Sequence, residues 1–303
     1  MALDDDYSGH KGFDPSFLCA GKADGRVFLP DLSPALAKQA TTLSASPKET
    51  VLRYRNYSVV MHRIRRFAIY SAANVDFSGR FVLARPKDVW RIDPRIGAAS
   101  QVTAACYENN QFDRGHLTRR EDLEYGPDKA TALACADDTC HWTNCTPQAA
   151  KFNEGRQLWA GLERHILEAA VAKDSFRAQV VTGPIFMPKD PPLPGFAEVR
   201  YPLRYWKVVS AINASSRLFA TAYVLDQRPE ITPAIRGAPE VPFGPYKTFQ
   251  TKIGEIERLT DLTFTAGQGS KRVSLSLFDP MVKARTATPY VPIETLDQLI
   301  LAS

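Results

Sequence analysis

The chain has 303 residues, of which 44% are hydrophobic and 23% charged, a composition typical of a globular protein. Its net charge of +5 and pI near 8.9 favour polyanionic partners without identifying one, because many basic proteins bind no nucleic acid. No apolar run approaches the ~20 residues of a membrane-spanning helix, and the acidic start of the chain lacks the apolar core of a secretory signal. We therefore expect a cytoplasmic protein with no membrane partner, unless a signal was trimmed or export follows another route.

The secondary structure expected along the chain begins with disorder over residues 1–12 and a loop with a short helix over 30–50. A strand is predicted at 67–73, and a second extended segment at 89–92. The longest helix is predicted from Phe152 to about Lys173, where apolar residues recur at three- and four-residue spacing. Three strands at 178–182, 205–210 and 218–224 and a helix over 248–259 follow.

The order of these elements predicts the fold class. Strands and helices do not alternate regularly, and consecutive strands in the C-terminal half can pair antiparallel, which indicates a mixed α+β fold. We expect one principal domain over residues 50–285, an N-terminal extension over 1–49 and a C-terminal tail over 286–303. The tail is interpreted as a strap packed on the domain, with a docking element as the alternative.

The cysteines are five in number, so they cannot all pair within one chain. Without a secretory signal, free thiols are the expected state. A zinc site is the alternative for the C-x₄-C-H-x₃-C cluster, but this spacing fits no common zinc module. We favour buried free thiols over a zinc site or a disulfide for the members of this cluster, which are Cys135, Cys140, His141 and Cys145.

The segment Asp113-Arg114-Gly115-His116 is the first candidate for chemistry. Glycine permits close approach of neighbouring groups, and histidine is the side chain most easily poised as a base near neutral pH. Arg114 supplies a positive charge suited to phosphate. The alternative is a strand end with a surface histidine and an Asp–Arg ion pair.

The second candidate segment runs from Thr143 through Gln148 to Gly155. Asn153 falls near the start of the long predicted helix, where its amide oxygen could bind Mg²⁺, an ion that prefers oxygen ligands and keeps several waters. The alternative is that Asn153 only caps the helix.

Taken together, these segments resemble a known family. The ordered motifs are Asp113-Arg114-Gly115-His116, Thr143-Asn144-x-x-Pro147-Gln148, Phe152-Asn153-x-Gly155 and Trp159-x-x-Leu162-Glu163. They resemble the DNA/RNA non-specific endonuclease family, part of the ββα-metal (His-Me finger) group that includes endonuclease G and bacterial sugar-non-specific nucleases. The likeness covers roughly residues 50 to 265, and it implies a central, mostly antiparallel sheet flanked by helices.

The resemblance also implies roles for individual residues. His116 would be the general base that deprotonates the attacking water, and Asn153 the direct protein ligand of Mg²⁺, with Mn²⁺ as a substitute. The ion would stabilise the developing charge and help the 3′-oxygen leave, so that the product carries a 5′-phosphate. Glu163 would hold metal-bound water, Asn144 would help position this network, and Arg114 would orient the substrate or brace the site.

In two places the sequence departs from the family pattern. Asn153 and Glu163 are ten positions apart, where the family has eight, so either the first helical turn is irregular or Glu163 lies away from the metal. The arginine expected four positions after the glutamate is Leu167, which leaves Arg164 or His165 as substitutes without a positional match.

The resemblance also implies an upstream phosphate-binding arginine, and two residues of this chain, Arg85 and Lys87, could take its place. Lys87 is nearer in spacing, although lysine binds phosphate as a point charge without the bidentate geometry of arginine.

Two functions from different classes follow from this interpretation. The first is an active metal-dependent endonuclease acting on DNA and RNA with little sequence preference. The second is a catalytically silent nucleic-acid-binding or regulatory protein on the same fold, and the presence of both His116 and Asn153 favours the first. A broadly acting nuclease would damage its own cell, so we also expect an inhibitory or activating partner protein, and the family resemblance adds a possible homodimer.

Overall fold

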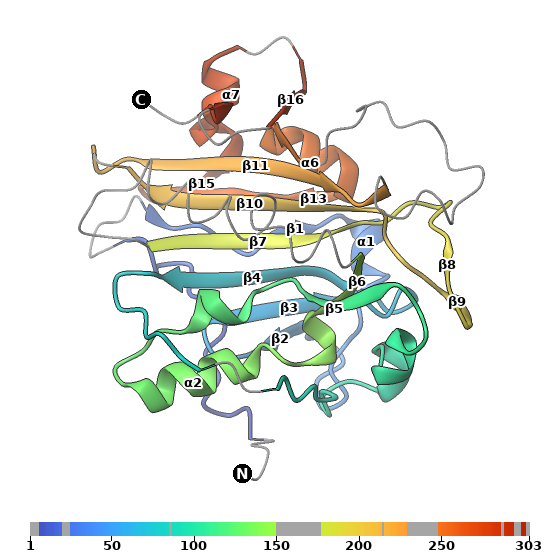
Figure 1. The fold of residues 1–303 in the computed structure, drawn as a ribbon. Helices are drawn as coiled ribbons and strands as arrows, with labels where there is room; N and C mark the ends of the chain where they lie inside the picture. Colours follow the sequence, from blue (N-terminus) through green and yellow to red (C-terminus); the bar gives the residue numbers. More distant parts are fainter. Residues whose placement is uncertain are drawn as a thin grey trace.

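A large antiparallel sheet forms the centre of the molecule (Figure 1). The computed structural model describes residues 6–19, 25–84, 87–149, 177–213, 215–228, 248–285, 288–293 and 298–300. Eight strands are ordered β16-β12-β11-β10-β7-β4-β3-β2, and every neighbouring pair is antiparallel. Their bounds are β2 Val51–Arg53, β3 Tyr57–Met61, β4 Ala68–Asp76, β7 Arg177–Ile185, β10 Arg204–Ile212, β11 Leu218–Asp226, β12 Thr248–Thr251 and β16 Tyr290–Pro292.

Smaller elements cover this sheet. In the described ranges the α-helices are α1 Pro34–Ala37, α2 Lys129–Asp138, α6 Ile253–Thr260 and α7 Pro280–Lys283. None of them is long and apolar enough to cross a membrane. The two-stranded pairs are β1 Asp31–Leu32 with β13 Leu262–Thr263, β5 Phe112–His116 with β6 Cys145–Ala149, β8 Pro192–Leu193 with β9 Phe196–Arg200, and β14 Thr265–Gln268 with β15 Lys271–Ser274.

Both faces of the sheet are buried, which explains why its inner strands are apolar at consecutive positions. Successive side chains of a strand point to opposite faces. Val180 and Val209 belong to one core, which also holds residues of α2, β5 and β6, whereas Val181 and Val208 belong to the other, which holds residues of α6. Figure 1 shows α2, β5 and β6 together in front of the sheet. The predicted mixed fold with a mostly antiparallel sheet is confirmed.

Two element predictions are corrected by the structure. Residues 248–251, expected to begin a helix, form β12, because all four are buried and pair with β11 and β16; the helix begins only at Ile253. The segment 89–92 forms no regular strand and makes an isolated parallel bridge between Arg91 and His141. The strand predictions at 67–73, 178–182, 205–210 and 218–224 coincide with β4, β7, β10 and β11, and the long helix predicted over 152–173 lies outside the described residues.

The described residues nearest to each terminus contact the folded domain. Residues 6–12, expected to be disordered, contact the core: the Tyr7 hydroxyl lies 2.8 Å from Nε2 of His141, and the Gly12 amide donates to the Tyr54 carbonyl at 2.9 Å. At the other end, β16 adds an edge strand to β12, and the Ile300 amide donates to Oε1 of Gln250 at 2.8 Å. These contacts favour the strap interpretation of the tail.

Candidate active site

The pairing of β5 with β6 joins the two motif segments. His116 is opposite Cys145, and Arg114 is opposite Pro147 in the antiparallel register. Arg114 and His116 are two positions apart on one strand, so their side chains lie on the same face. Arg114 is exposed and His116 is partly exposed, which makes this the outward face of β5.

Gly115 is required because a side chain crosses directly over it. A Cβ atom at this position would lie 2.2 Å from Cδ and 2.4 Å from Oε1 of Gln148. Gln148 is fully buried, so it has little room to withdraw. The close approach expected from the glycine in the motif is therefore present, and it holds the backbone before His116 against β6.

The side chain of Asn144 forms hydrogen bonds with the backbone that follows His116. Its Oδ1 accepts from the Thr118 amide at 2.9 Å and from Oγ of Ser71 at 3.1 Å. Its Nδ2 donates to the carbonyls of Thr118 at 2.8 Å and Thr139 at 3.0 Å. Asn144 is fully buried, so it acts on the site by positioning the chain after His116. Its predicted link to metal-bound water stays a prediction.

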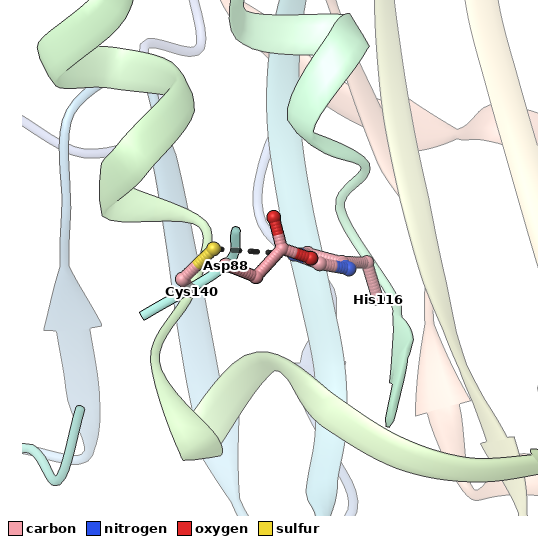
Figure 2. Close-up of side chains that lie close together, drawn as sticks. All are labelled: Asp88, His116 and Cys140. Atoms are coloured by element: carbon pink, nitrogen blue, oxygen red, sulfur yellow. Dashed lines mark hydrogen bonds between the residues drawn. The ribbon is translucent and has the colours of Figure 1, made fainter. Parts of the chain in front are cut away.

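Three side chains surround the imidazole of His116. The Trp90 ring lies 4.6 Å away, centroid to centroid, and stacks in turn on Trp142 at 5.2 Å. Sγ of Cys140 lies 3.7 Å from Nε2 of His116 in a hydrogen bond whose donor depends on the imidazole tautomer. The carboxylate of Asp88 is the third neighbour, and Figure 2 shows Asp88, His116 and Cys140 converging from separate segments.

A parallel contact between two segments brings these neighbours to His116. The Arg91 amide donates to the Cys140 carbonyl at 2.9 Å, and the Trp142 amide donates to the Arg91 carbonyl at 2.9 Å. Asp88 and Trp90 are thereby held beside Cys140 and Trp142. Sequence reasoning missed this cluster, and the only signal available was the proximity of Asp88 and Trp90 to the candidate Lys87.

The charges around the site are unevenly distributed. Burial raises the pKa of the Cys140 thiol to about 11, with Asp88 raising the pKa further and Arg120 lowering it, so the thiol is protonated near neutral pH. The Arg114 guanidinium is exposed and lies 5.9 Å from the centroid of the Trp142 ring. A fixed cation and a partly exposed imidazole on one face form an arrangement suited to a phosphate group.

A buried polar network lies behind the site. The His141 ring contacts the Tyr7 hydroxyl through Nε2 and the Asp138 carbonyl through Nδ1, at 2.8 and 2.6 Å. Burial, helped by the positive charge of Arg91, lowers the pKa of His141 to about 3, so its ring is neutral. His141 therefore has a structural environment, without a close cysteine ligand.

All five cysteines, each within the described residues, are free thiols, as expected. The members of the C-x₄-C-H-x₃-C cluster have separate surroundings: Cys135 accepts from Nδ2 of Asn56 at 3.5 Å, and Cys145 donates to the Tyr107 hydroxyl at 3.2 Å. The cluster therefore does not form the zinc site that its spacing made conceivable.

Several predicted site residues lie outside the described part of the chain. They are the metal ligand Asn153, the helix residues Glu163 and Arg164, and Arg85. Lys87 is described and exposed, and it directly precedes Asp88, so it lies at the edge of the His116 cluster. Its predicted contact with substrate phosphate stays a prediction.

Comparisons with known proteins identify the family and support the fold. The family profile described as DNA/RNA non-specific endonuclease matches residues 37–271, so the chain belongs to this family. Among solved structures, the chain resembles one of the EndoG/EndoGI complex, with a TM-score of 0.52 and 20% identity, covering 71% of this chain and 84% of the matched chain. At this identity the likeness supports the fold.

Relatives in sequence include proteins of bacterial, fungal and animal origin. The chain is 32% identical to the uncharacterized protein y4fB of Sinorhizobium fredii over 277 residues, 85% of this chain but 39% of the relative. It is 24% identical to nuclease C1 of Cunninghamella echinulata over 59% of this chain and 67% of that protein. It is 36% identical to mitochondrial endonuclease G of Caenorhabditis elegans over 27% of this chain and 24% of that protein. The chain thus spans about two fifths of y4fB and about two thirds of nuclease C1.

Proposed function

We propose that this protein is a metal-dependent endonuclease that hydrolyses phosphodiester bonds of DNA and RNA with little sequence preference. The observation that carries the proposal is the pairing of β5 with β6, which puts His116 and Arg114 on one outward face beside the second motif. Membership of the DNA/RNA non-specific endonuclease family supports the same activity.

His116 acts as the general base in this proposal. A neutral imidazole has one nitrogen lone pair that can accept a proton from water, and its partial exposure leaves room for that water. The Trp90 ring, whose centroid lies 4.6 Å from that of the imidazole at an interplanar angle of 44°, limits the orientations of the imidazole. The hydrogen bonds of Asn144 fix the backbone of Thr118, two positions after His116. Arg114 holds the phosphate by its charge, on the same face of the strand.

The metal is Mg²⁺, with Asn153 as its protein ligand and Mn²⁺ as an alternative ion. Asn153 follows the end of β6 by four positions, and β6 pairs with the strand that carries His116. The bound ion would supply charge stabilisation for the phosphorane and the leaving 3′-oxygen, which leaves a 5′-phosphate on the product.

The central test compares the wild type with His116→Ala on supercoiled plasmid and on total RNA. Removal of a general base predicts a loss of ~10²-fold or more in both activities. His62→Ala is the matched control, because His62 lies at the turn after β3 and contacts Phe186. A His116→Ala protein that folds normally and retains activity within a few-fold of wild type would refute the assignment.

The silent binding protein is the alternative that the same assay separates. A nuclease shortens both substrates in Mg²⁺ and stops in EDTA, whereas a binding protein shifts DNA on a gel without shortening it. Asn153→Ala tests the ligand directly, since it should reduce the Mg²⁺-supported rate.

A partner protein that restrains activity is also part of the proposal. The matched solved structure is of the EndoG/EndoGI complex and concerns the mechanism of EndoG inhibition. Co-purification from the native host, followed by release of nuclease activity on removing the bound protein, would identify such a partner.

A further inference from the structure

Three side chains with metal-ligating atoms meet at the imidazole of His116. One ligand atom each from Asp88, His116 and Cys140 can be chosen so that all three lie within 4.8 Å of one another. Within the described ranges, this is the only group of three or more His, Cys, Asp or Glu side chains that meets this condition. The three residues come from the segment after β4, from the end of β5 and from the segment after α2. Figure 2 shows their side chains close together.

The separation of sulfur and nitrogen matches a tetrahedral zinc site. With a Zn–S distance of about 2.3 Å and a Zn–N distance of about 2.0–2.1 Å, two tetrahedral ligands lie about 3.6 Å apart. Sγ of Cys140 and Nε2 of His116 are separated by 3.7 Å. The widest separation in the group is at most 4.8 Å, so a shift of about 1 Å, within the reach of a side-chain rotation, completes three corners of the tetrahedron.

The types of ligand distinguish between metals. Thiolate sulfur and imidazole nitrogen suit Zn²⁺, whereas Mg²⁺ prefers oxygen and keeps its waters. Cys140 and Asp88 would contribute two negative charges that balance the charge of the ion. Asp88 is partly exposed, which gives the ion a route to the site, and three protein ligands leave a fourth position for water or a phosphate oxygen.

We propose that Asp88, His116 and Cys140 form a Zn²⁺-binding site that inhibits the enzyme by occupying its general base. On binding, the thiol of Cys140 loses its proton to solvent and the zinc–sulfur bond forms, with no change of oxidation state. A neutral imidazole has a single nitrogen lone pair, and the other nitrogen carries hydrogen. Once zinc takes that lone pair, neither nitrogen can accept a proton from water, whichever tautomer the free enzyme uses. The inhibitory consequence rests on the proposed role of His116, whereas the metal site itself does not.

The first experiment measures binding without relying on activity. The full-length protein is stripped with EDTA and titrated with Zn²⁺ against a chromophoric chelator, and separately with Co²⁺ to detect the thiolate-to-metal charge-transfer band in the near ultraviolet. We expect one ion per chain. Cys140→Ser should abolish the charge-transfer band, and both Cys140→Ser and Asp88→Asn should weaken Zn²⁺ affinity by at least about tenfold.

Cys135→Ser is the matched control. Cys135 and Cys140 are both 2% exposed, and burial raises the pKa of each thiol to about 11, but Cys135 lies outside the cluster. This variant should keep the wild-type Zn²⁺ affinity and the charge-transfer band. No Zn²⁺ binding, or binding that is equal in wild type, Cys140→Ser and Asp88→Asn, would overturn the site.

The second experiment measures the ratio of nuclease rates with and without Zn²⁺ at fixed excess Mg²⁺. Wild type and Cys135→Ser should be inhibited at the Zn²⁺ concentration that saturates the site, and Cys140→Ser should need at least about tenfold more. If the wild type binds Zn²⁺ as expected but has no nuclease activity, the endonuclease assignment fails while the metal site stands. If the site fills and the rate is unchanged, the inhibitory role is overturned.

Discussion

Replacement of Asn144 by alanine is the sharpest test of how the fold supports His116. The substitution removes four hydrogen bonds, which link the chain after β5 to β4 and to the segment after α2. The amide and carbonyl of Thr118 and the carbonyl of Thr139 lose these partners in a fully buried setting. The oxygen of Ser71 keeps its contact with Oγ1 of Thr118 at 2.7 Å.

The expected cost follows from these contacts. A buried hydrogen bond contributes about 1 kcal/mol, and a buried group left without a partner costs about 1–3 kcal/mol. Because each lost bond and the buried group that it leaves unpaired are counted in both figures, we expect Asn144→Ala to lower the free energy of unfolding by about 3–5 kcal/mol. For a chain of this size that corresponds to a fall in Tm on the order of 10 °C.

Thermal unfolding followed by circular dichroism measures this loss, with nuclease rates taken well below the Tm of the variant. Asn74→Ala is the control, because Asn74 is also buried on β4 and its Oδ1 accepts one described hydrogen bond, from Gln179 at 3.1 Å. It should lose only about 1 kcal/mol. Equal stability of the Asn144 and Asn74 variants would refute the stabilising role of the four Asn144 hydrogen bonds. An unchanged nuclease rate in folded Asn144→Ala would refute the positioning role of Asn144.

Three further predictions test the surroundings of the site. Gly115→Ala should destabilise the protein by about 1–3 kcal/mol through overpacking, and adding Gln148→Ala should recover most of that loss in a double-mutant cycle of unfolding measurements. His141 has a pKa of about 3 in the folded protein against an ordinary value of 6.5, so its contribution to the free energy of unfolding is complete above pH 6.5 and is lost as the pH falls towards 3. In urea unfolding, His141→Gln should reduce the slope of this free energy against pH by about 1.4 kcal/mol per pH unit on the acid side, and an unchanged slope would contradict the buried neutral ring. Arg114→Ala should weaken DNA binding, measured by fluorescence anisotropy, and should reduce the slope of log binding constant against log salt concentration by about 0.9, whereas Arg114→Lys should keep the wild-type slope. Identical slopes for the wild type and both variants would exclude a phosphate contact.

Some features could be predicted because they are local. The strands at 178–182, 205–210 and 218–224 are short apolar runs, and such runs favour extended backbone wherever both faces are covered. The helix expected from 248 was wrong over its first four residues, because pairing with β11 on one side and β16 on the other decides their conformation. That pairing depends on a strand near the end of the chain, beyond the reach of any local pattern.

The sequence by itself identified the residues of the motif: an imidazole at His116, a cation at Arg114 and a glycine between them that admits a close neighbour. The tertiary structure alone decided what lies against that imidazole. Asp88 and Cys140 are 28 and 24 positions from His116, and they meet it because the chain at Arg91 runs beside the chain at Cys140. The periodicity of apolar residues shows which face of a helix or strand is buried. The free energy that holds two distant segments together is spread over many contacts, so no local sequence pattern marks the residues that come together.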